Sequence, residues 1–323
     1  MVRPAMTETA AKTAVVVPCF KTGRTVEKVL AGIPDWVDHI IVVDDACPER
    51  AGDAAERSGD PRVVVLRHAR NQGVGGAVVT GYRKALELGS DIVVKMDGDD
   101  QMDPAFAERL VESLVADRAD YAKGNRFHDF RALRAMPRAR LFGNSLLSFF
   151  IKFASGYWNL MDPTNGYTAI HRRVLTELNL DRLDRRYFFE SDMLINLNIV
   201  GAVTVDVPMP ARYGAENSSL SVPRAAAALP SKILRGLVRR LFFRYFIYDF
   251  NMASVYLLLG APLLLFGIGL GLIEWYLSLA TGTPRALGTV MLVVLPIILG
   301  FQMLLQAVSI DIAAVPRRPG NGS

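Results

Sequence analysis

The N-terminal two thirds of the chain alternates short apolar runs with amphipathic stretches. Short, continuous apolar runs predict buried strands, and apolar residues spaced three to four apart predict helices. The predicted strands cover residues 13–18, 39–43, 62–66 and 91–96, and the predicted helices cover residues 23–33, 51–58, 75–88 and 104–116. This alternation predicts a parallel sheet with helices on both faces. Ligands of such sheets gather at the carboxyl ends of the strands.

The C-terminal third has a different pattern. Residues 252–273 and 286–310 are uncharged and apolar, and neither stretch has a polar face along most of its length. Because about 20 apolar residues cross a bilayer as a helix, we expect two transmembrane helices rather than two buried core helices. Just before them, Lys232, Arg235 and Arg239 fall on one side of a helical wheel and leucines on the other. This pattern predicts that residues 228–250 form amphipathic helices that lie in the membrane interface.

Charge indicates which side of the membrane holds the rest of the chain. Basic residues flank the apolar pair on its outer sides, and only Arg285 lies between the two stretches. Residues 1–12 form a short stretch rich in small side chains, without the apolar core of a secretory signal. We therefore expect a multi-pass protein of the plasma (inner) membrane whose main domain and both termini are cytoplasmic. The net charge of +5 fits a membrane surface or a phosphate substrate, and we expect no nucleic-acid partner.

Acidic residues follow the fourth predicted strand at alternate positions. Asp97, Asp99 and Gln101 offer only oxygen ligands, which suit Mg²⁺ or Mn²⁺. A calcium-binding loop of the helix-loop-helix type has similar spacing, but it needs glycine where this chain has Met102. A solvated acidic turn with a helix-capping aspartate is the other interpretation.

Two more strand ends and a glycine-rich segment point to the same edge of the sheet. Pro18 ends the first strand, Asp44 and Asp45 end the second, and residues 71–77 read Asn-Gln-Gly-Val-Gly-Gly-Ala. Such a segment allows a ligand to approach the backbone and starts a helix whose amides can face phosphate. It can equally be a turn that lets a helix and a strand pack closely.

Taken in order, these motifs resemble those of the family 2 inverting glycosyltransferases. The resemblance rests on Val17-Pro-Cys-Phe20, Val42-Val-Asp-Asp45, Asn71-Gln-Gly73 and Met96-Asp-Gly-Asp99. With the two apolar stretches, the chain is similar to dolichol-phosphate mannose synthases and bacterial polyprenyl-phosphate glycosyltransferases. The resemblance implies a glycosyltransferase-A-like, Rossmann-like α/β fold with a mixed sheet, and a C-terminal transmembrane hairpin. The implied parts are a flexible N-terminus (1–12), the transferase domain (13–227), interfacial helices (228–250), two spans (251–312) and a cytoplasmic tail (313–323).

The resemblance also implies roles for individual residues. Asp97, Asp99 and Gln101 would hold the divalent ion that bridges the donor diphosphate, and Asp162, Asp99, Asp192 and Glu190 would form the catalytic group. Donor-binding residues would be Pro18, Phe20, Asp44, Asp45, Asn71, Gly73, Asp97 and Gly98. Because arginine offers a fork of donors that suits phosphate, the candidates for the acceptor phosphate are Arg126, Arg138, Arg140 and Arg212, with Ser218.

Two departures from the family pattern concern the donor. The first motif continues Lys21-Thr-Gly rather than Tyr-Asn-Glu, and Ser219 stands where mannose synthases often have lysine. These differences favour a UDP-sugar and leave GDP-mannose possible. The expected acceptor is a polyprenyl phosphate such as undecaprenyl phosphate; the alternatives are a glycan hydroxyl and a membrane-anchored module that binds nucleotide or metal without catalysis. Gln302 and Gln306 share a helix face, which suggests hydrogen bonds between helices or a homo-oligomer.

Overall fold

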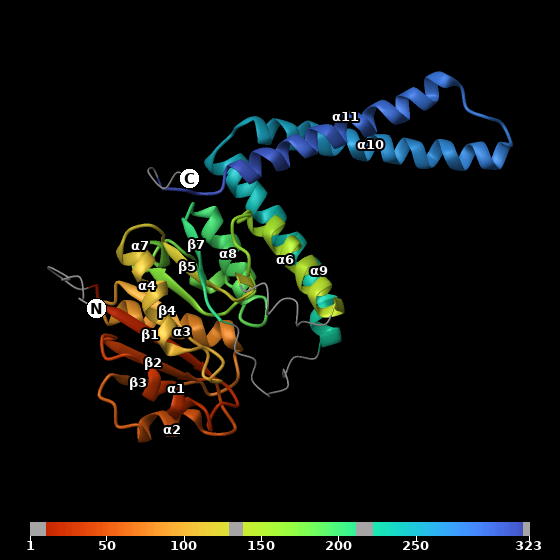
Figure 1. Ribbon diagram of the computed structural model, residues 1–323. Helices are drawn as coiled ribbons and strands as arrows, with labels where there is room; N and C mark the ends of the chain where they lie inside the picture. The colour runs from red at the N-terminus through yellow and green to blue at the C-terminus, as the bar shows by residue number, and fades with distance from the viewer. Residues whose placement is uncertain (1–10, 129–137, 211–221, 319–323) are drawn as a thin grey trace. The chain divides into compact units, whose positions relative to one another are not determined.

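The computed structural model describes residues 11–128, 138–210 and 222–318 (Figure 1). The chain divides into two compact units, one of residues 1–237 together with 316–323 and the other of residues 238–315. The first unit contains the sheet, and the second contains two long apolar helices.

The first unit is built on a seven-stranded mixed sheet with the strand order β3-β2-β1-β4-β6-β5-β7. The strands β1 to β4 are parallel, as their alternation with helices predicts. The strand β6 runs antiparallel to both β4 and β5, and β7 is parallel to β5. The bounds are β1 Thr13–Cys19, β2 His39–Asp44, β3 Val63–Arg67, β4 Ile92–Lys95, β5 Tyr121–Asn125, β6 Thr168–His171 and β7 Thr204–Pro208.

The four helices predicted within residues 23–116 fall close to their predicted places. The stretch predicted at 104–116 begins with a 3-10 turn that is capped by the side chain of Asp103. The bounds are α1 Val26–Gly32, α2 Ala51–Arg57, α3 Val74–Glu87, η1 Pro104–Phe106, α4 Ala107–Val115, η2 Arg126–His128, α6 Arg138–Ser155, α7 Arg172–Leu175, η3 Leu180–Arg182, α8 Phe189–Ile199 and α9 Val222–Phe242. The helix α9 ends in the second unit.

Both faces of the sheet are covered, which explains why its central strands are apolar without alternation. Val15 and Val17 of β1 belong to the cluster that contains residues of α1, α2 and α4. Val16 points the other way, because side chains alternate along a strand. It contacts Gly81 of α3, where a Cβ atom would collide with its side chain.

The strand register brings the sequence motifs to one edge. Cys19 at the end of β1 pairs with Asp44 at the end of β2, and Val16 pairs with Lys95 at the end of β4. The residues after these strands therefore share the edge that was predicted to bind ligands. The strands β2 and β4 reach this edge with their carboxyl ends because both are parallel to β1.

The second unit consists of the end of α9, a π-helical turn η4 (Phe243–Tyr248), α10 (Met252–Thr281) and α11 (Leu287–Ala313). Both long helices have the length and composition to cross a membrane. The helix α10 continues to Thr281, past the predicted end of the first span at residue 273. Glu274, just beyond that predicted end, pairs with Arg285 at 3.0 Å. Near the other end of the pair, Asp311 accepts hydrogen bonds from Arg240 (2.6 Å) and Tyr245 (2.7 Å). The predicted interfacial segment 228–250 corresponds to the second half of α9 and η4.

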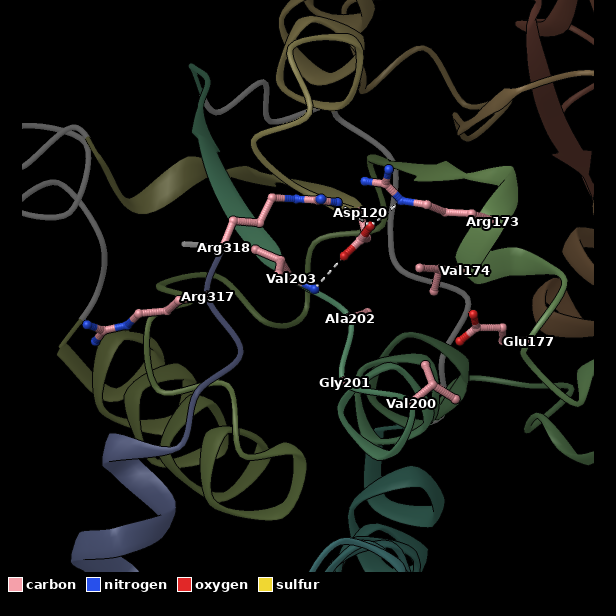
Figure 2. A pocket seen from close by; sticks show the side chains of 10 residues that line it. All are labelled: Asp120, Arg173, Val174, Glu177, Val200, Gly201, Ala202, Val203, Arg317 and Arg318. Atoms are coloured by element: carbon pink, nitrogen blue, oxygen red, sulfur yellow. Dashed lines mark hydrogen bonds and ion pairs between the residues drawn. The ribbon is translucent and has the colours of Figure 1, made fainter. Parts of the chain in front are cut away.

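Residues 316–318 belong to the first unit. Arg318 donates to Asp117 at 3.0 Å and to Asp120 at 2.8 Å, and Asp120 also accepts from the backbone of Val203. Asp120, Val203 and Arg318 border a pocket at the start of β5 (Figure 2). The edge predicted to bind ligands lies at the carboxyl ends of the strands. The pocket lies at the opposite end of β5, so it is separate from that edge.

Candidate active site

The turn after β4 presents the acidic residues predicted to hold a metal. The Asp97 side chain is 30% exposed, and Asp99 Oδ1 accepts the backbone N–H of Gln101 at 3.1 Å. The carbonyl of Gly98 accepts a hydrogen bond from Thr25 Oγ1 at 2.6 Å, which ties the turn to the start of α1. The turn is therefore fixed to the region that follows β1, as expected for a shared crevice.

A buried lysine joins Asp97 to Glu190. Lys95 Nζ lies 2.7 Å from Asp97 Oδ1 and 3.3 Å from Glu190 Oε1, and Lys95 is only 1% exposed. Burial opposes its charge, but the two carboxylates outweigh that effect and hold the pKa of Lys95 above its ordinary value. Gly166 covers the ammonium group so closely that a Cβ atom there would collide with it.

The oxygen donors of this turn fit a hard divalent ion. Among the residues that the structure describes, no three His, Cys, Asp or Glu side chains gather into a metal-holding group. Mg²⁺ is commonly held by one or two carboxylates, with water and substrate phosphates completing its shell. Asp97 and Asp99, with the amide of Gln101, match that donor chemistry.

Asp44 and Asp45, predicted to bind the nucleoside, organise the backbone around the end of β2. Asp44 accepts the N–H groups of Cys47 and Gly52, each at 2.7 Å. Asp45 accepts those of Gln72 and Gly73, each at 2.8 Å. Both carboxylates are buried, so they fix the backbone at this edge of the sheet from within.

The glycine-rich segment is attached to the same edge through Asp45. His68 Nδ1 lies 2.6 Å from Asp45 Oδ1, and Asn71 Nδ2 donates to the Asp45 carbonyl at 3.4 Å. Gly73 has φ +88°, a conformation that L side chains rarely adopt, and it stands directly before α3. The positive φ supports a structural need for glycine here.

At the end of β1, the Phe20 side chain after Pro18 is exposed.

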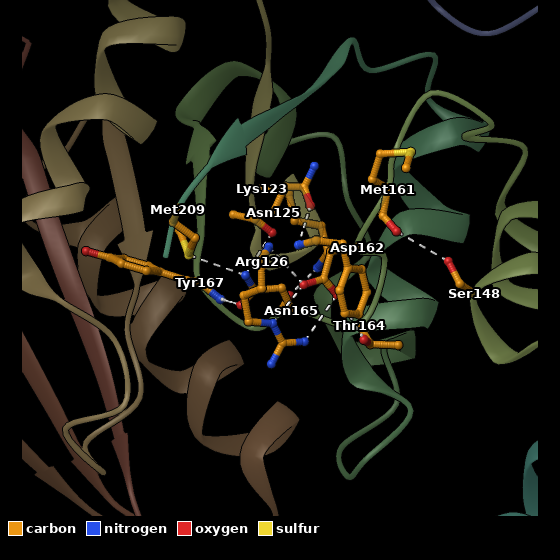
Figure 3. Close-up of polar contacts among 12 residues, drawn as sticks. Lys123, Asn125, Arg126, Ser148, Met161, Asp162, Thr164, Asn165, Tyr167 and Met209 are labelled. Atoms are coloured by element: carbon orange, nitrogen blue, oxygen red, sulfur yellow. Dashed lines mark hydrogen bonds and ion pairs between the residues drawn. The ribbon is translucent and has the colours of Figure 1, made fainter. Parts of the chain in front are cut away.

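Arg126, predicted to bind the acceptor phosphate, and Asp162, predicted to be catalytic, form a two-point ion pair (Figure 3). Arg126 Nε donates to Asp162 Oδ2 at 2.7 Å, and its NH2 group donates to Oδ1 at 3.1 Å. Asp162 is fully buried and also accepts from Thr164 Oγ1 at 3.1 Å. The Arg126 side chain is 37% exposed, so its guanidinium is held in place and remains reachable from solvent.

Two more ionisable residues lie behind this pair and were missed by the sequence analysis. Lys123 is fully buried, donates to the Asn165 carbonyl, and has its pKa lowered to about 8 by burial. Asp206 on β7 accepts the N–H of Met161 at 2.6 Å and the side-chain amide of Asn125 at 3.1 Å. Burial raises the pKa of Asp206 to about 6.

The position of Asp206 relates it directly to the ion pair. Asn125 precedes Arg126, and Met161 precedes Asp162, so Asp206 holds the chain next to both partners. Its second oxygen, Oδ1, is buried and has no hydrogen-bond partner among the described residues. A charged strand residue between Val205 and Val207 is the sequence signal that could have identified it.

The acidic pair of α8 is divided between two environments. Glu190 faces Lys95, whereas Asp192 Oδ2 accepts the backbone N–H of Asp184 at 2.8 Å. Glu190 is thereby connected to the acidic turn after β4. Arg138 and Arg140 begin α6, but the structure does not describe their side chains, and Arg212 and Ser218 lie outside the described residues.

The sequence model of glycosyl transferase family 2 matches residues 14–178. The chain belongs to this family. As a family 2 glycosyltransferase, it resembles an undecaprenyl-phosphate mannosyltransferase of Micrococcus luteus, with 31% identity over 60% of this chain and 81% of the relative. A UDP-N-acetylglucosamine–dolichyl-phosphate N-acetylglucosaminyltransferase of Methanococcus voltae is 27% identical, over 56% and 77% of the two chains.

The solved structures support the fold of this glycosyltransferase. Glucosyl-3-phosphoglycerate synthase from Mycobacterium tuberculosis, in complex with UDP, has a TM-score of 0.54 and 23% identity, covering 74% of this chain and 86% of its own. The predicted fold class, a glycosyltransferase-A-like mixed sheet with two apolar C-terminal helices, is confirmed.

Proposed function

We propose that this glycosyltransferase moves one sugar from a nucleotide donor to a polyprenyl phosphate, inverting the anomeric centre, at the cytoplasmic face of the plasma membrane. The observation that carries the proposal is the Arg126–Asp162 pair, which holds an accessible guanidinium at the end of β5. Such a guanidinium suits a phosphate acceptor. The names of the relatives and the two apolar helices support a lipid as the carrier of that phosphate.

The state of Asp162 favours a phosphate acceptor over a hydroxyl acceptor. A phosphate monoester has its second pKa near 6, so its attacking oxygen is largely ionised at neutral pH. An alcohol would need a general base to remove its proton. Asp162 has no exposed surface and both its oxygens accept hydrogen bonds, so we assign it to holding Arg126. Arg126 would then align the acceptor phosphate behind the anomeric carbon.

The donor diphosphate would be bound at the turn after β4. Asp97, Asp99 and Gln101 would hold Mg²⁺ or Mn²⁺, which neutralises the charge that develops on the departing nucleotide. Lys95 keeps the Asp97 and Glu190 carboxylates in place beneath this turn. Asp44, Asp45 and the segment at Gly73 form the wall against which the nucleoside would lie.

The proposed donor is a UDP-sugar, with GDP-mannose as the second candidate. Ser219, which stands where mannose synthases often have lysine, favours the uridine nucleotide. The two relatives described above are named for different sugars, one mannose and one N-acetylglucosamine. A donor panel must therefore include both nucleotides.

The path of the chain supports the proposed membrane arrangement. The helix α9 leads from the first unit into the second, and residues 316–318 after α11 belong to the first unit again, where Arg318 is paired with Asp117 and Asp120. Both ends of the helical pair would thus be on the side of the catalytic unit. The excess of Lys and Arg outside the pair favours the cytoplasm for that side.

A transfer assay tests the proposal. Purified full-length protein is incubated with Mg²⁺ or Mn²⁺, undecaprenyl phosphate and labelled UDP-sugars or GDP-mannose. We expect label from one donor to enter the lipid, and a chelator or the Asp99→Asn substitution to reduce the rate at least about a hundredfold. The matched control is Asp100→Asn, since Asp100 pairs with Lys28 and its positive φ suits asparagine.

Other outcomes would identify the alternatives. Label that enters a glycan but not the lipid would replace the phosphate acceptor with a hydroxyl. Metal-dependent nucleotide binding without transfer to any acceptor would indicate a binding module. Equal losses in the two aspartate variants would remove Asp99 from the metal site.

A further inference from the structure

The helices α10 and α11 pack through glycines. A Cβ atom at Gly300 would collide with the backbone of Gly260 and Leu264, and one at Gly267 would collide with Ile297. Small residues let the backbones of two helices approach closely, which is the usual way to pack helices in lipid. The side of α11 that carries Gly300 is therefore occupied by α10.

A polar stripe lies on the opposite side of α11. At about 100° per residue, Gln302 is about 180° away from Val293, whose carbonyl lies at the glycine seam beside Gly267. Gln306 and Ser309 follow at helical spacing on the side of Gln302, and all three side chains are exposed. Within the part of the chain that the structure describes, neither glutamine has a hydrogen-bond partner. Hydrogen bonding between α10 and α11, one of the two roles predicted for these glutamines, is thus excluded.

Gln302, the first residue of the stripe, would lie deep in a bilayer. The helix α11 has 27 residues, and at 1.5 Å per residue it is about 40 Å long. By the same rise, Gln302 would be about 22 Å from the Leu287 end and about 16 Å from the Ala313 end, close to the middle. An amide at that depth meets only hydrocarbon unless another helix covers it, and such polar residues commonly form hydrogen bonds between helices.

We propose that the stripe of Gln302, Gln306 and Ser309 binds the same stripe of a second copy of this chain. Copies inserted in the same direction and related by a two-fold axis along the bilayer normal place every residue opposite its own counterpart at equal depth. A glutamine amide contains both a donor and an acceptor, so Gln302 and Gln306 can pair with themselves. A different partner would need polar groups at these same two depths. The proposal depends on the membrane location proposed above.

Self-association of the full-length protein in lipid vesicles tests this interface. Two differently labelled samples are co-reconstituted, and energy transfer between them is measured as the lipid-to-protein ratio is increased. We expect association in the parent, and an association constant at least about tenfold lower when both glutamines become leucine. The variant with both glutamines changed to asparagine retains the amides and should recover part of the association. Leu265→Ala, at an exposed position of α10, should leave it unchanged.

The possible failures are distinguishable. A parent protein that is released from membranes by alkaline carbonate would refute the membrane location itself. A parent that stays in the membrane, transfers sugar and yet shows no energy transfer would overturn only the self-association. Undiminished association in the double leucine variant would show that copies meet through another surface.

Discussion

Lys95 Nζ and Asp97 Oδ1 lie 2.7 Å apart, with the lysine buried beneath the acidic turn. The same ammonium group reaches Glu190 at 3.3 Å, so one cation joins the end of β4 to the start of α8. A single side chain thus links elements that are far apart in the sequence at the candidate site.

Replacing Lys95 with methionine should destabilise the protein strongly. The substitution leaves two carboxylates without their shared buried cation, and loss of one partner of a buried pair costs about 3–5 kcal/mol. Chemical denaturation followed by tryptophan fluorescence measures the change. Lys84→Met is the control, since Lys84 pairs with Glu87 at the surface and should change the unfolding free energy by less than about 1 kcal/mol. Equal effects in the two variants would contradict the bridging role.

Replacing Arg126 with lysine should weaken use of the acceptor more than use of the donor. Lysine keeps the charge but loses the two-point contact with Asp162, and a hydrogen bond to a charged group is worth about 1.5–3 kcal/mol. We expect kcat/KM for the lipid phosphate to fall by about tenfold to a hundredfold, with the KM for the nucleotide sugar little changed. A surface substitution, Arg118→Lys, should alter neither value. An effect confined to the donor would assign Arg126 to the nucleotide instead.

Asp206 should make stability depend on pH below neutrality. Its pKa is about 6 in the folded protein against an ordinary value of 3.8, so the folded state binds more protons between these values. The unfolding free energy should therefore fall as pH rises from about 4 to about 6, by up to about 3 kcal/mol for this group. Asp206→Asn should remove that fall, which denaturation at a series of pH values measures. A fall of the same size in the variant would mean that other groups cause it.

Lys123 should make the stability of the protein depend on pH in the alkaline range. Burial lowers its pKa to about 8 from 10.5, so the unfolded state binds more protons between these values. Stability should rise as pH increases through this range, by about 3 kcal/mol for this group. Lys123→Met should abolish the rise, and Lys84→Met should retain it, in the same denaturation series.

The sequence predicted the positions of the strand ends well, because parallel strands place their carboxyl ends at one edge. The sequence analysis did not identify the side chains that form ion pairs and hydrogen bonds with the residues of the candidate site. Lys95 and Asp206 lie within apolar strand sequences, where only the folded structure reveals what a charged side chain faces. The Arg126–Asp162 pair joins residues 36 positions apart, and its two members were predicted without their contact. The first apolar helix was predicted too short because Glu274 interrupts the apolar run, although it pairs with Arg285.

The contact between Gly166 and Lys95 limits which sequences can occupy this fold. A methyl group at position 166 would take the space of the lysine ammonium, so the two positions are not independent. During divergence, a larger residue at 166 should be accompanied by a shorter or uncharged side chain at 95. Joint variation of these two positions among related chains would then be a record of this one contact.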